Sequence, residues 1–280
     1  MAQRPTTTNT KALDAPRRGL WSIAPERWLN KLLILVVIVT GIFSCQTPTD
    51  DSLTIAGAAN LQYALRALTA SFTAETGIDC ELVFASSGKL TAQISEGAPF
   101  DVFLAADEKY PASLHAKQLT LGPPVTYAYG RLALWSTLPD FQPTLAGLTA
   151  PRIRSIAIPN PITAPYGQAA VAALRQQELY DSIAPKLVFG ESVAQANQFV
   201  TAQAAEVGFT AVSVVMAPAM ERYKSWIIVD EKSYAPIAQS AVVIDHKGQK
   251  KHPSGEAFLN FLVSKKGKEI LAEFGYLLPD

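Results

Sequence analysis

The stretch "FASSGKLTAQISEGAPFDVFLAAD", residues 84–107, holds a strand end, a helix and a second strand within a short length. A helix-like run follows the serine pair, and the apolar run "DVFLAA" (101–106) is typical of a buried strand. Before it, "LTIAG" (53–57) has the same strand character, and "LQYALRALTASFTAETG" (61–77) has one apolar helical face and ends at a capping glycine. Strands and helices that alternate at such short spacing predict a parallel sheet with helices on both faces.

Two β-rich segments indicate that the chain passes between two lobes. "VTYAYGRLALWS" (125–136) is long and is interrupted by Gly130, as a crossing strand would be, and "IAQSAVVID" (237–245) can cross back. We therefore expect two α/β lobes, the second inserted into the first. The expected bounds are 53–128 plus 238–280 for the first lobe and 129–237 for the second. Within the second lobe, the patterns predict strands and helices at 155–161, 167–180, 191–203, 205–215 and 225–230.

Residues 1–45 have the layout of an export signal. A polar segment with several Lys and Arg residues precedes the apolar run "LLILVVIVTGIF" (32–43), which at about 1.5 Å per residue is short for a bilayer core of roughly 30 Å. The run ends just before Cys45, which resembles a bacterial lipoprotein signal and implies cleavage and acylation there. An uncleaved signal anchor is the alternative. Residues 46–52 then form a polar tether, and the folded part is expected in the periplasm or cell envelope, anchored to a membrane.

Charge and cysteine content exclude several function classes. Lys plus Arg and Asp plus Glu both number 24, so no basic excess points to nucleic acid. If Cys45 carries lipid, Cys80 is alone; no disulfide is then expected, and Cys80 is interpreted as a buried apolar residue. The three histidines are scattered through polar segments, which argues against a metal site or a catalytic triad. A bound anion must therefore be held by local geometry.

Two strand-to-helix junctions carry small residues and an uncharged polar residue. In "GAANLQYAL" Asn60 falls at the expected helix N-cap, and in "VFASSGKLTAQI" Ser86 or Ser87 falls at the next. Ligands of open α/β sheets bind outside the carboxyl ends of the strands, and helix N-termini favour anions. The alternative is that Asn and Ser are only preferred N-caps without a ligand.

The Gly88–Lys89 pair does not form a nucleotide-binding loop. Such a loop needs a glycine five residues before its Gly-Lys pair and a Ser or Thr after it, whereas this chain has Val83 and Leu90 at those positions. Lys89 is instead interpreted as a solvated residue of the first helical turn. Gly88 is expected to permit close approach to a ligand held by the serines.

Three stretches, "TIAGAANLQYAL", "FASSGKLTAQISEGAPFDVFLAAD" and "PNPITAPYGQAAVAAL", resemble the periplasmic molybdate-binding proteins of ABC transporters, and the likeness runs from about Leu53 to the C-terminus. It implies a two-lobed, type II periplasmic-binding-protein fold. Each lobe would be a mainly parallel sheet flanked by helices, with one tetrahedral oxyanion in the cleft. Members of this family hold molybdate or tungstate by neutral hydrogen bonds from hydroxyl and backbone N–H groups.

The resemblance also implies which residues bind the anion. The first loop contributes Asn60, with the backbone N–H of Ala59, and the second contributes Ser87 with Ser86 beside it. The remaining contacts fall on Tyr166 and on the backbone at Val193.

One position departs from the family pattern. Some members have a tyrosine where this chain has Ala211, which leaves one donor unaccounted for. Tyr166 could supply the missing phenol from the other lobe.

The loops carry the chemistry expected for a fully deprotonated oxyanion. Molybdate, tungstate and sulfate only accept hydrogen bonds at neutral pH, whereas phosphate still carries a proton and calls for an acceptor carboxylate. None of the loops has Asp or Glu at its tip. The nearest are Asp101, interpreted as a strand-start or turn residue, and Asp107, interpreted as a helix cap.

We therefore expect a monomeric solute-binding protein, not an enzyme and without a cofactor, that captures molybdate or tungstate and delivers it to an ABC permease. One alternative keeps the fold but binds sulfate, phosphate or a chelated metal. Another is an extracytoplasmic enzyme such as a transferase, although the loops hold no nucleophile–base pair. A third is a structural envelope lipoprotein without a small ligand.

Overall fold

The computed structural model describes residues 52–247 and 253–279. Its first lobe is built on a five-stranded sheet in the order β2-β1-β3-β10-β4. In this sheet β1 is parallel to β2 and β3, whereas β10 is antiparallel to β3 and β4. The strands are β1 (Leu53–Ala58), β2 (Cys80–Ala85), β3 (Val102–Leu104), β4 (Val125–Gly130) and β10 (Ile237–Val243).

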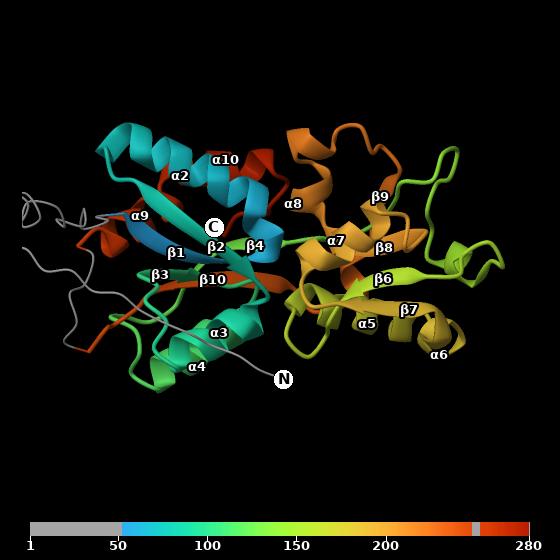
Figure 1. Ribbon diagram of the computed structural model, residues 1–280, viewed down its shortest axis with the longest axis horizontal. Coiled ribbons are helices and arrows are strands. Elements are labelled where there is room, and N and C mark those ends of the chain that lie inside the picture. Colours follow the sequence, from blue (N-terminus) through green and yellow to red (C-terminus); the bar gives the residue numbers. More distant parts are fainter. Residues whose placement is uncertain (1–51, 248–252, 280) are drawn as a thin grey trace, which may run out of the picture. The chain divides into compact units, whose positions relative to one another are not determined.

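Helices cover both faces of this sheet, as Figure 1 shows: α2, α9 and α10 lie on one side, and α3 and α4 on the other. Because successive residues of a strand point to opposite faces, Ile55 packs with Phe72 and Phe258 beneath α2 and α9, whereas Ala56 packs with Leu90 beneath α3. The Phe72 and Phe258 rings meet edge to face with centroids 5.3 Å apart. The helices are α2 (Gln62–Thr76), α3 (Ser87–Ser95), α4 (Lys109–Ala116), α9 (Gly255–Val263) and α10 (Lys265–Glu273).

The second lobe has its own five-stranded sheet, in the order β7-β6-β8-β5-β9. Here β6 is parallel to β7 and β8, and β5 is antiparallel to β8 and β9. The strands are β5 (Leu132–Ser136), β6 (Ile156–Pro159), β7 (Leu187–Gly190), β8 (Val207–Ala211) and β9 (Trp226–Ile228). The helices are α5 (Pro165–Gln176), α6 (Tyr180–Ile183), α7 (Val193–Thr201) and α8 (Val212–Val215). Short 3-10 helices lie at Ala59–Leu61, Ala146–Thr149, Ala184–Lys186, Pro218–Met220 and Glu231–Ser233.

The two sheets confirm the two-lobed α/β fold that the sequence predicts. The chain leaves the first sheet at Gly130 and enters the second at Leu132, and it returns to the first sheet at Ile237. Gly77 caps α2 in the left-handed conformation, with a φ of 73°, as its place after the apolar helical face indicates. The sequence pattern does not indicate β7, because this four-residue strand lies in a mixed segment without a clear apolar period.

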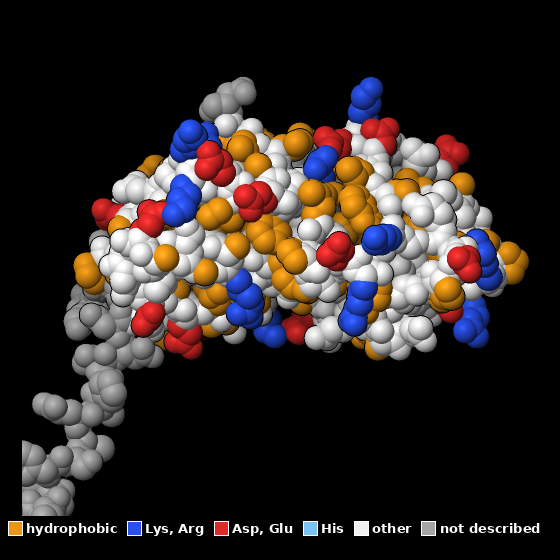
Figure 2. Space-filling model, turned by 90° about the horizontal axis from the view of Figure 1, so that it is seen from above, with side chains coloured by type: hydrophobic (Ala, Val, Ile, Leu, Met, Phe, Trp, Pro, Cys, Tyr) orange, Lys and Arg blue, Asp and Glu red, His pale blue; other side chains and the backbone are white. Residues whose placement is uncertain are grey.

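Several expectations fall on residues outside the described ranges. The export signal, Cys45 and the tether up to residue 51 are among them. Within residues 52–247 and 253–279, no helix has the length and hydropathy to cross a bilayer. Figure 2 shows acidic and basic side chains interspersed over one face, in keeping with the balanced formal charge.

Candidate functional site

A small cavity lies where the two lobes meet, and it collects all six residues that the sequence analysis selected. The space inside is about 10 Å³, close to the minimum that holds one water molecule. A larger solute, such as a tetrahedral oxyanion, therefore requires the walls to move apart slightly. The lining residues are Ala58, Ala59, Asn60, Ser86, Ser87, Ala106, Ala164, Pro165, Tyr166 and Val193.

The walls of this cavity are formed by strand ends and helix starts. In the first lobe, residues just after the carboxyl ends of β1, β2 and β3 contribute, and Ser87 begins α3. In the second lobe, Pro165 begins α5 and Val193 begins α7. Three helices thus point their N-termini, which are the positive ends of their dipoles, at one place. Among the residues that the structure describes, no charged side chain lines the cavity, so an anion there would be held by neutral donors.

The two serines differ in their hydrogen bonds, although both are buried. Ser87 Oγ accepts a hydrogen bond from the backbone N–H of Ala106 at 3.0 Å, which leaves the hydroxyl hydrogen of Ser87 free to donate. Ser86 takes the N-cap position of α3, but its side chain makes no capping bond. Within the described part of the chain, Ser86 Oγ has no hydrogen-bond partner.

Asn60 is not the helix N-cap that the sequence predicts. It lies inside the 3-10 helix Ala59–Leu61, which precedes α2, and no side chain caps that turn. Asn60 Nδ2 instead donates to Gln239 Oε1 and to the Tyr276 hydroxyl, both at 3.0 Å. Within the described residues its Oδ1 is buried without a partner.

Gln239 connects Asn60 to the phenol of the second lobe. Gln239 Nε2 donates to the Tyr166 hydroxyl at 3.0 Å, and the Tyr127 hydroxyl donates to Gln239 Oε1 at 3.0 Å. Burial raises the pKa of both phenols, Tyr127 and Tyr166, well above its usual value, so both stay protonated at neutral pH. We call the five residues Asn60, Tyr127, Tyr166, Gln239 and Tyr276 the tyrosine–amide network.

Gln239, Tyr127 and Tyr276 are not among the residues predicted from the sequence. One signal was present: Gln239 is the single amide in the otherwise apolar and small-residue strand "IAQSAVV" and is fully buried. A buried polar side chain needs hydrogen-bond partners, which marks such a position for attention. Ala211, where some members of the resembled family have a tyrosine, is buried at the end of β8. The Tyr276 phenol, from the C-terminal segment, instead contacts Asn60.

Contacts between the lobes also surround the cavity. Lys89 of α3 forms an ion pair with Glu191 at 2.7 Å, although the sequence analysis treated Lys89 as merely solvated. The backbone N–H of Gly88 donates to the carbonyl of Thr163 at 2.9 Å. A Cβ at Gly88 would lie 3.1 Å from the Thr163 Cα, so glycine permits this close approach.

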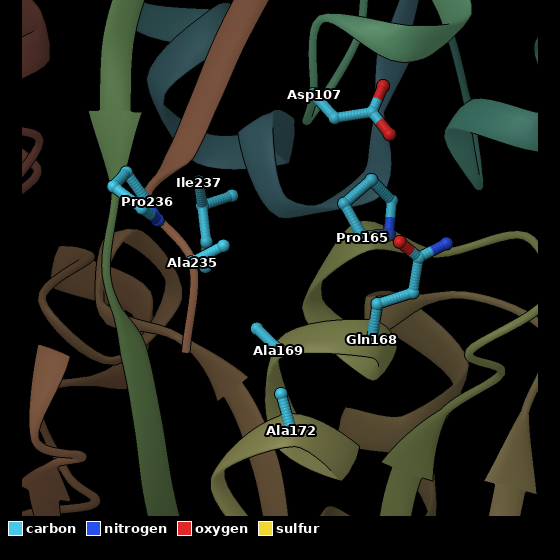
Figure 3. Close-up of a pocket in the computed structure, with 8 residues that line it drawn as sticks. All are labelled: Asp107, Pro165, Gln168, Ala169, Ala172, Ala235, Pro236 and Ile237. Carbon is cyan, nitrogen blue, oxygen red and sulfur yellow. The ribbon is translucent and has the colours of Figure 1, made fainter. Parts of the chain in front are cut away.

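A second cavity, of about 200 Å³, lies beside Pro165 (Figure 3). Figure 3 shows Asp107 and Gln168 near Pro165, with Ala235, Pro236 and Ile237 across from Ala169 and Ala172. Burial raises the pKa of Asp107, and its Oδ1 accepts a hydrogen bond from the Tyr110 N–H at 3.2 Å, in the first turn of α4. Asp107 lines this second cavity and not the first.

The remaining candidate groups, Asp101 and Cys80, do not belong to the cavity lining. Among residues 52–247 and 253–279, no group of three or more His, Cys, Asp or Glu could hold a metal ion. Asp101 Oδ2 accepts the Thr54 N–H at 2.8 Å just before β3 begins, as a residue at a strand start does. Cys80, which the sequence predicts to be buried, is only partly buried. Desolvation raises the pKa of its thiol.

Comparisons with known proteins agree with this architecture. The family model of bacterial extracellular solute-binding proteins matches residues 53–277. The chain is 36% identical over 245 residues to a molybdate-binding protein of Azotobacter vinelandii, covering 87% of this chain and 96% of that protein. A Rhodobacter capsulatus molybdate-binding protein is 35% identical over 221 residues, covering 79% and 86%.

A solved structure gives the same picture. The periplasmic molybdate-binding protein of Azotobacter vinelandii superposes with a TM-score of 0.77 at 33% identity, covering 82% of this chain and all of that one. This likeness agrees with the type II arrangement of the lobes. From the family match and these relatives, the chain belongs to the bacterial extracellular solute-binding protein family.

Proposed function

We propose that this protein captures molybdate or tungstate outside the cytoplasm and delivers it to an ABC permease. The observation that carries the proposal is the cavity between the lobes, which is lined by hydroxyl and backbone groups and by the Asn60 amide and, among the described residues, by no charged side chain. A fully deprotonated dianion accepts hydrogen bonds only, so it suits such a lining. The relatives named as molybdate-binding proteins support the choice of anion.

Six residues are proposed to hold the anion. Ser87 would donate its hydroxyl hydrogen to the anion while its oxygen accepts the Ala106 N–H. Ser86 would also donate to the anion, because its hydroxyl has no other partner in the described chain. Tyr166 would donate its phenol from the second lobe. Backbone N–H groups at the helix starts would complete the shell at Ala59 and Val193, with Asn60 beside them. Each charge-assisted hydrogen bond is worth about 1.5–3 kcal/mol.

The binding event is proposed to close the lobes. The chain crosses between the sheets at Gly130–Leu132 and again before Ile237, and these crossings would act as the hinge. The closed, liganded monomer would then dock on the permease. We also propose that the protein acts by binding without catalytic turnover, and that acylation of Cys45 tethers it to a membrane.

One observation favours a second candidate, a protonated oxyanion such as hydrogen phosphate. Asn60 Oδ1 is buried without a partner in the described chain, and this oxygen could accept the proton that such an anion carries. Against it, no carboxylate of residues 52–247 or 253–279 lines the cavity. The two candidates therefore differ in a measurable preference between anions.

A thermal-unfolding scan of the purified protein with molybdate, tungstate, sulfate and phosphate tests the proposal. A ligand at about 1,000 times its dissociation constant adds about 4 kcal/mol to the free energy of unfolding. For a chain of this size, the midpoint then rises by about 8–16 °C. We expect this rise with molybdate and tungstate and little with the other two. A rise with phosphate alone would favour the second candidate, and no rise with any anion would reject both.

Membrane attachment has its own test. Expression of Cys45→Ser in a bacterial host, followed by fractionation, should move the protein from the membrane fraction to the soluble one if Cys45 is acylated. Retention of the variant in the membrane would favour the uncleaved signal anchor instead.

A further inference from the structure

Gln239 occupies an unusual place in the site. It lies in β10, close to the point where the chain returns from the second lobe, and its side chain is completely buried. The pairing register of β10 with β4 shifts between Gln239 and Ser240, and such a bulge redirects a side chain. Gln239 thus reaches one proposed anion ligand from each lobe, Asn60 and Tyr166, although it does not line the cavity itself.

The direction of these hydrogen bonds determines which donors remain for a ligand. Gln239 Nε2 gives its hydrogen to the Tyr166 oxygen, so the single phenol hydrogen of Tyr166 is not used by Gln239. Gln239 Oε1 accepts from Asn60 Nδ2, which leaves Asn60 with a buried, unpartnered Oδ1. In this arrangement Tyr166 can donate to an anion, and the Asn60 side chain offers only an acceptor.

Turning both amides over gives the opposite arrangement. Asn60 Nδ2 would then take the position of the unpartnered Oδ1 and could donate to the anion. Asn60 Oδ1 would face Gln239, which would have to present Nε2 to it and Oε1 to Tyr166. The Tyr166 hydrogen would then be spent on Gln239. The two amides can therefore turn only together, and the side-chain donors of Asn60 and Tyr166 are alternatives.

We propose that Gln239 is a positioning residue that sets, through the orientation of its amide, whether Tyr166 or Asn60 donates to the bound oxyanion. This inference rests on the proposed function and adds a residue that tunes the site without touching the ligand. The space around the amide is closed, because a Cβ at Gly130 would overlap the Tyr166 hydroxyl and Gln239 Nε2. The Tyr127 hydroxyl contacts the amide from the far side, and its single hydrogen can go either to Gln239 Oε1 or to the Ala105 carbonyl, both 3.0 Å from the phenol oxygen.

A double-mutant cycle on the full chain tests this role. Calorimetric titration with molybdate would compare the wild type with Gln239→Met, Tyr166→Phe and the double variant. Each single change should weaken binding by about 10- to 100-fold, the range for a hydrogen bond to a charged group. Because Gln239 acts through Tyr166, the double variant should bind within about twofold of the weaker single variant.

Two further variants separate positioning from a loss of folding. Tyr234→Phe removes another tyrosine hydroxyl, which accepts the Leu132 N–H at 3.0 Å within the second lobe, and it should keep affinity within about twofold. Gln239→Glu keeps the shape but can only accept from Tyr166 and Asn60 when ionised, so it should weaken molybdate binding at least about tenfold. Unfolding midpoints without anion would show that the variants are folded.

The outcomes are distinct. If the wild-type protein binds molybdate and the Gln239→Met and Gln239→Glu variants bind it equally well, this inference is overturned. The proposed function is then still supported. Losses that multiply in the double variant would also overturn it, because Gln239 would then act independently of Tyr166. Wild-type protein that binds no oxyanion would overturn the proposed function and this inference together.

Discussion

Replacing Ser87 by alanine should impair both binding and folding, and the structure separates the two effects. Ser87 is 1% exposed, and its Oγ accepts a hydrogen bond from the Ala106 N–H at 3.0 Å. Alanine removes this acceptor and leaves a buried backbone donor without a partner. It also removes the hydroxyl hydrogen that points to no other group and that we assign to the anion.

Each effect has its own magnitude. A buried N–H left unsatisfied costs about 1–3 kcal/mol, which for a chain of this size lowers the unfolding midpoint by about 2–12 °C. A lost hydrogen bond to a charged oxyanion costs about 1.5–3 kcal/mol, which weakens binding by about 10- to 150-fold. Ser86→Ala provides the matched comparison. Ser86 Oγ has no partner in the described chain, so this variant should lose affinity without losing stability in the absence of anion.

The assay combines thermal unfolding without anion and calorimetric titration with molybdate for both serine variants. A Ser87→Ala variant that binds molybdate within about twofold of the wild type would refute the ligand role of Ser87. Equal unfolding temperatures of the two variants would refute its structural role. A Ser86→Ala variant with unchanged affinity would remove Ser86 from the proposed ligand set and leave Ser87 in it.

Three further outcomes are expected. Gly130→Ala should weaken molybdate binding at least about tenfold, because the new Cβ would displace the Tyr166 hydroxyl. Gly122→Ala is the control, because a Cβ at Gly122 meets no described atom within 4 Å. Equal affinities of the two variants would contradict the prediction. Lys89→Met should weaken molybdate binding by less than about fivefold at low salt and by even less at high salt. The reason is that its ion pair with Glu191 is exposed to solvent: the Lys89 side chain is 46% exposed and that of Glu191 60%. A larger loss of affinity in titrations would show that Lys89 contacts the anion directly. The unfolding midpoint should fall as pH rises above about 10. Burial raises the pKa of all three phenols of the tyrosine–amide network, so the folded protein keeps protons that the unfolded chain releases near pH 10. A midpoint that stays constant up to about pH 11 would contradict this prediction.

The alternation of strands and helices was readable from the sequence because it depends on local patterns. The small and polar residues after β1 and β2 were selected for the same reason, since the end of a parallel strand fixes where the following loop lies. Structure then places those loops, together with the starts of α5 and α7, around one cavity. The ligand roles themselves stay a prediction, as do the expected lobe boundaries.

The tyrosine–amide network could not be read in this way. Gln239 and Tyr276 lie 179 and 216 residues from Asn60 along the chain, so no local pattern connects them. The same holds for Lys89 and Glu191, which are 102 residues apart. The prediction that Asn60 is an N-cap was wrong for a related reason. Its side chain is engaged by these distant partners, and Asn60 lies within the 3-10 turn that precedes α2.

The energies of the contacts between the lobes indicate what controls closure. The exposed pair of Lys89 and Glu191 is worth about 0–1 kcal/mol, and the bond from the Gly88 N–H to the Thr163 carbonyl about 0.5–1.5 kcal/mol. Neither of these two contacts is strong enough to hold the lobes together by itself. Several charge-assisted bonds from both lobes to one anion would exceed them, so the population of the closed form should follow occupancy of the site. A permease that recognises the closed form would then bind mainly protein that carries the anion. Stronger contacts between the lobes would populate the closed form without an anion, so the strength of these contacts would determine how well the permease distinguishes loaded from empty protein.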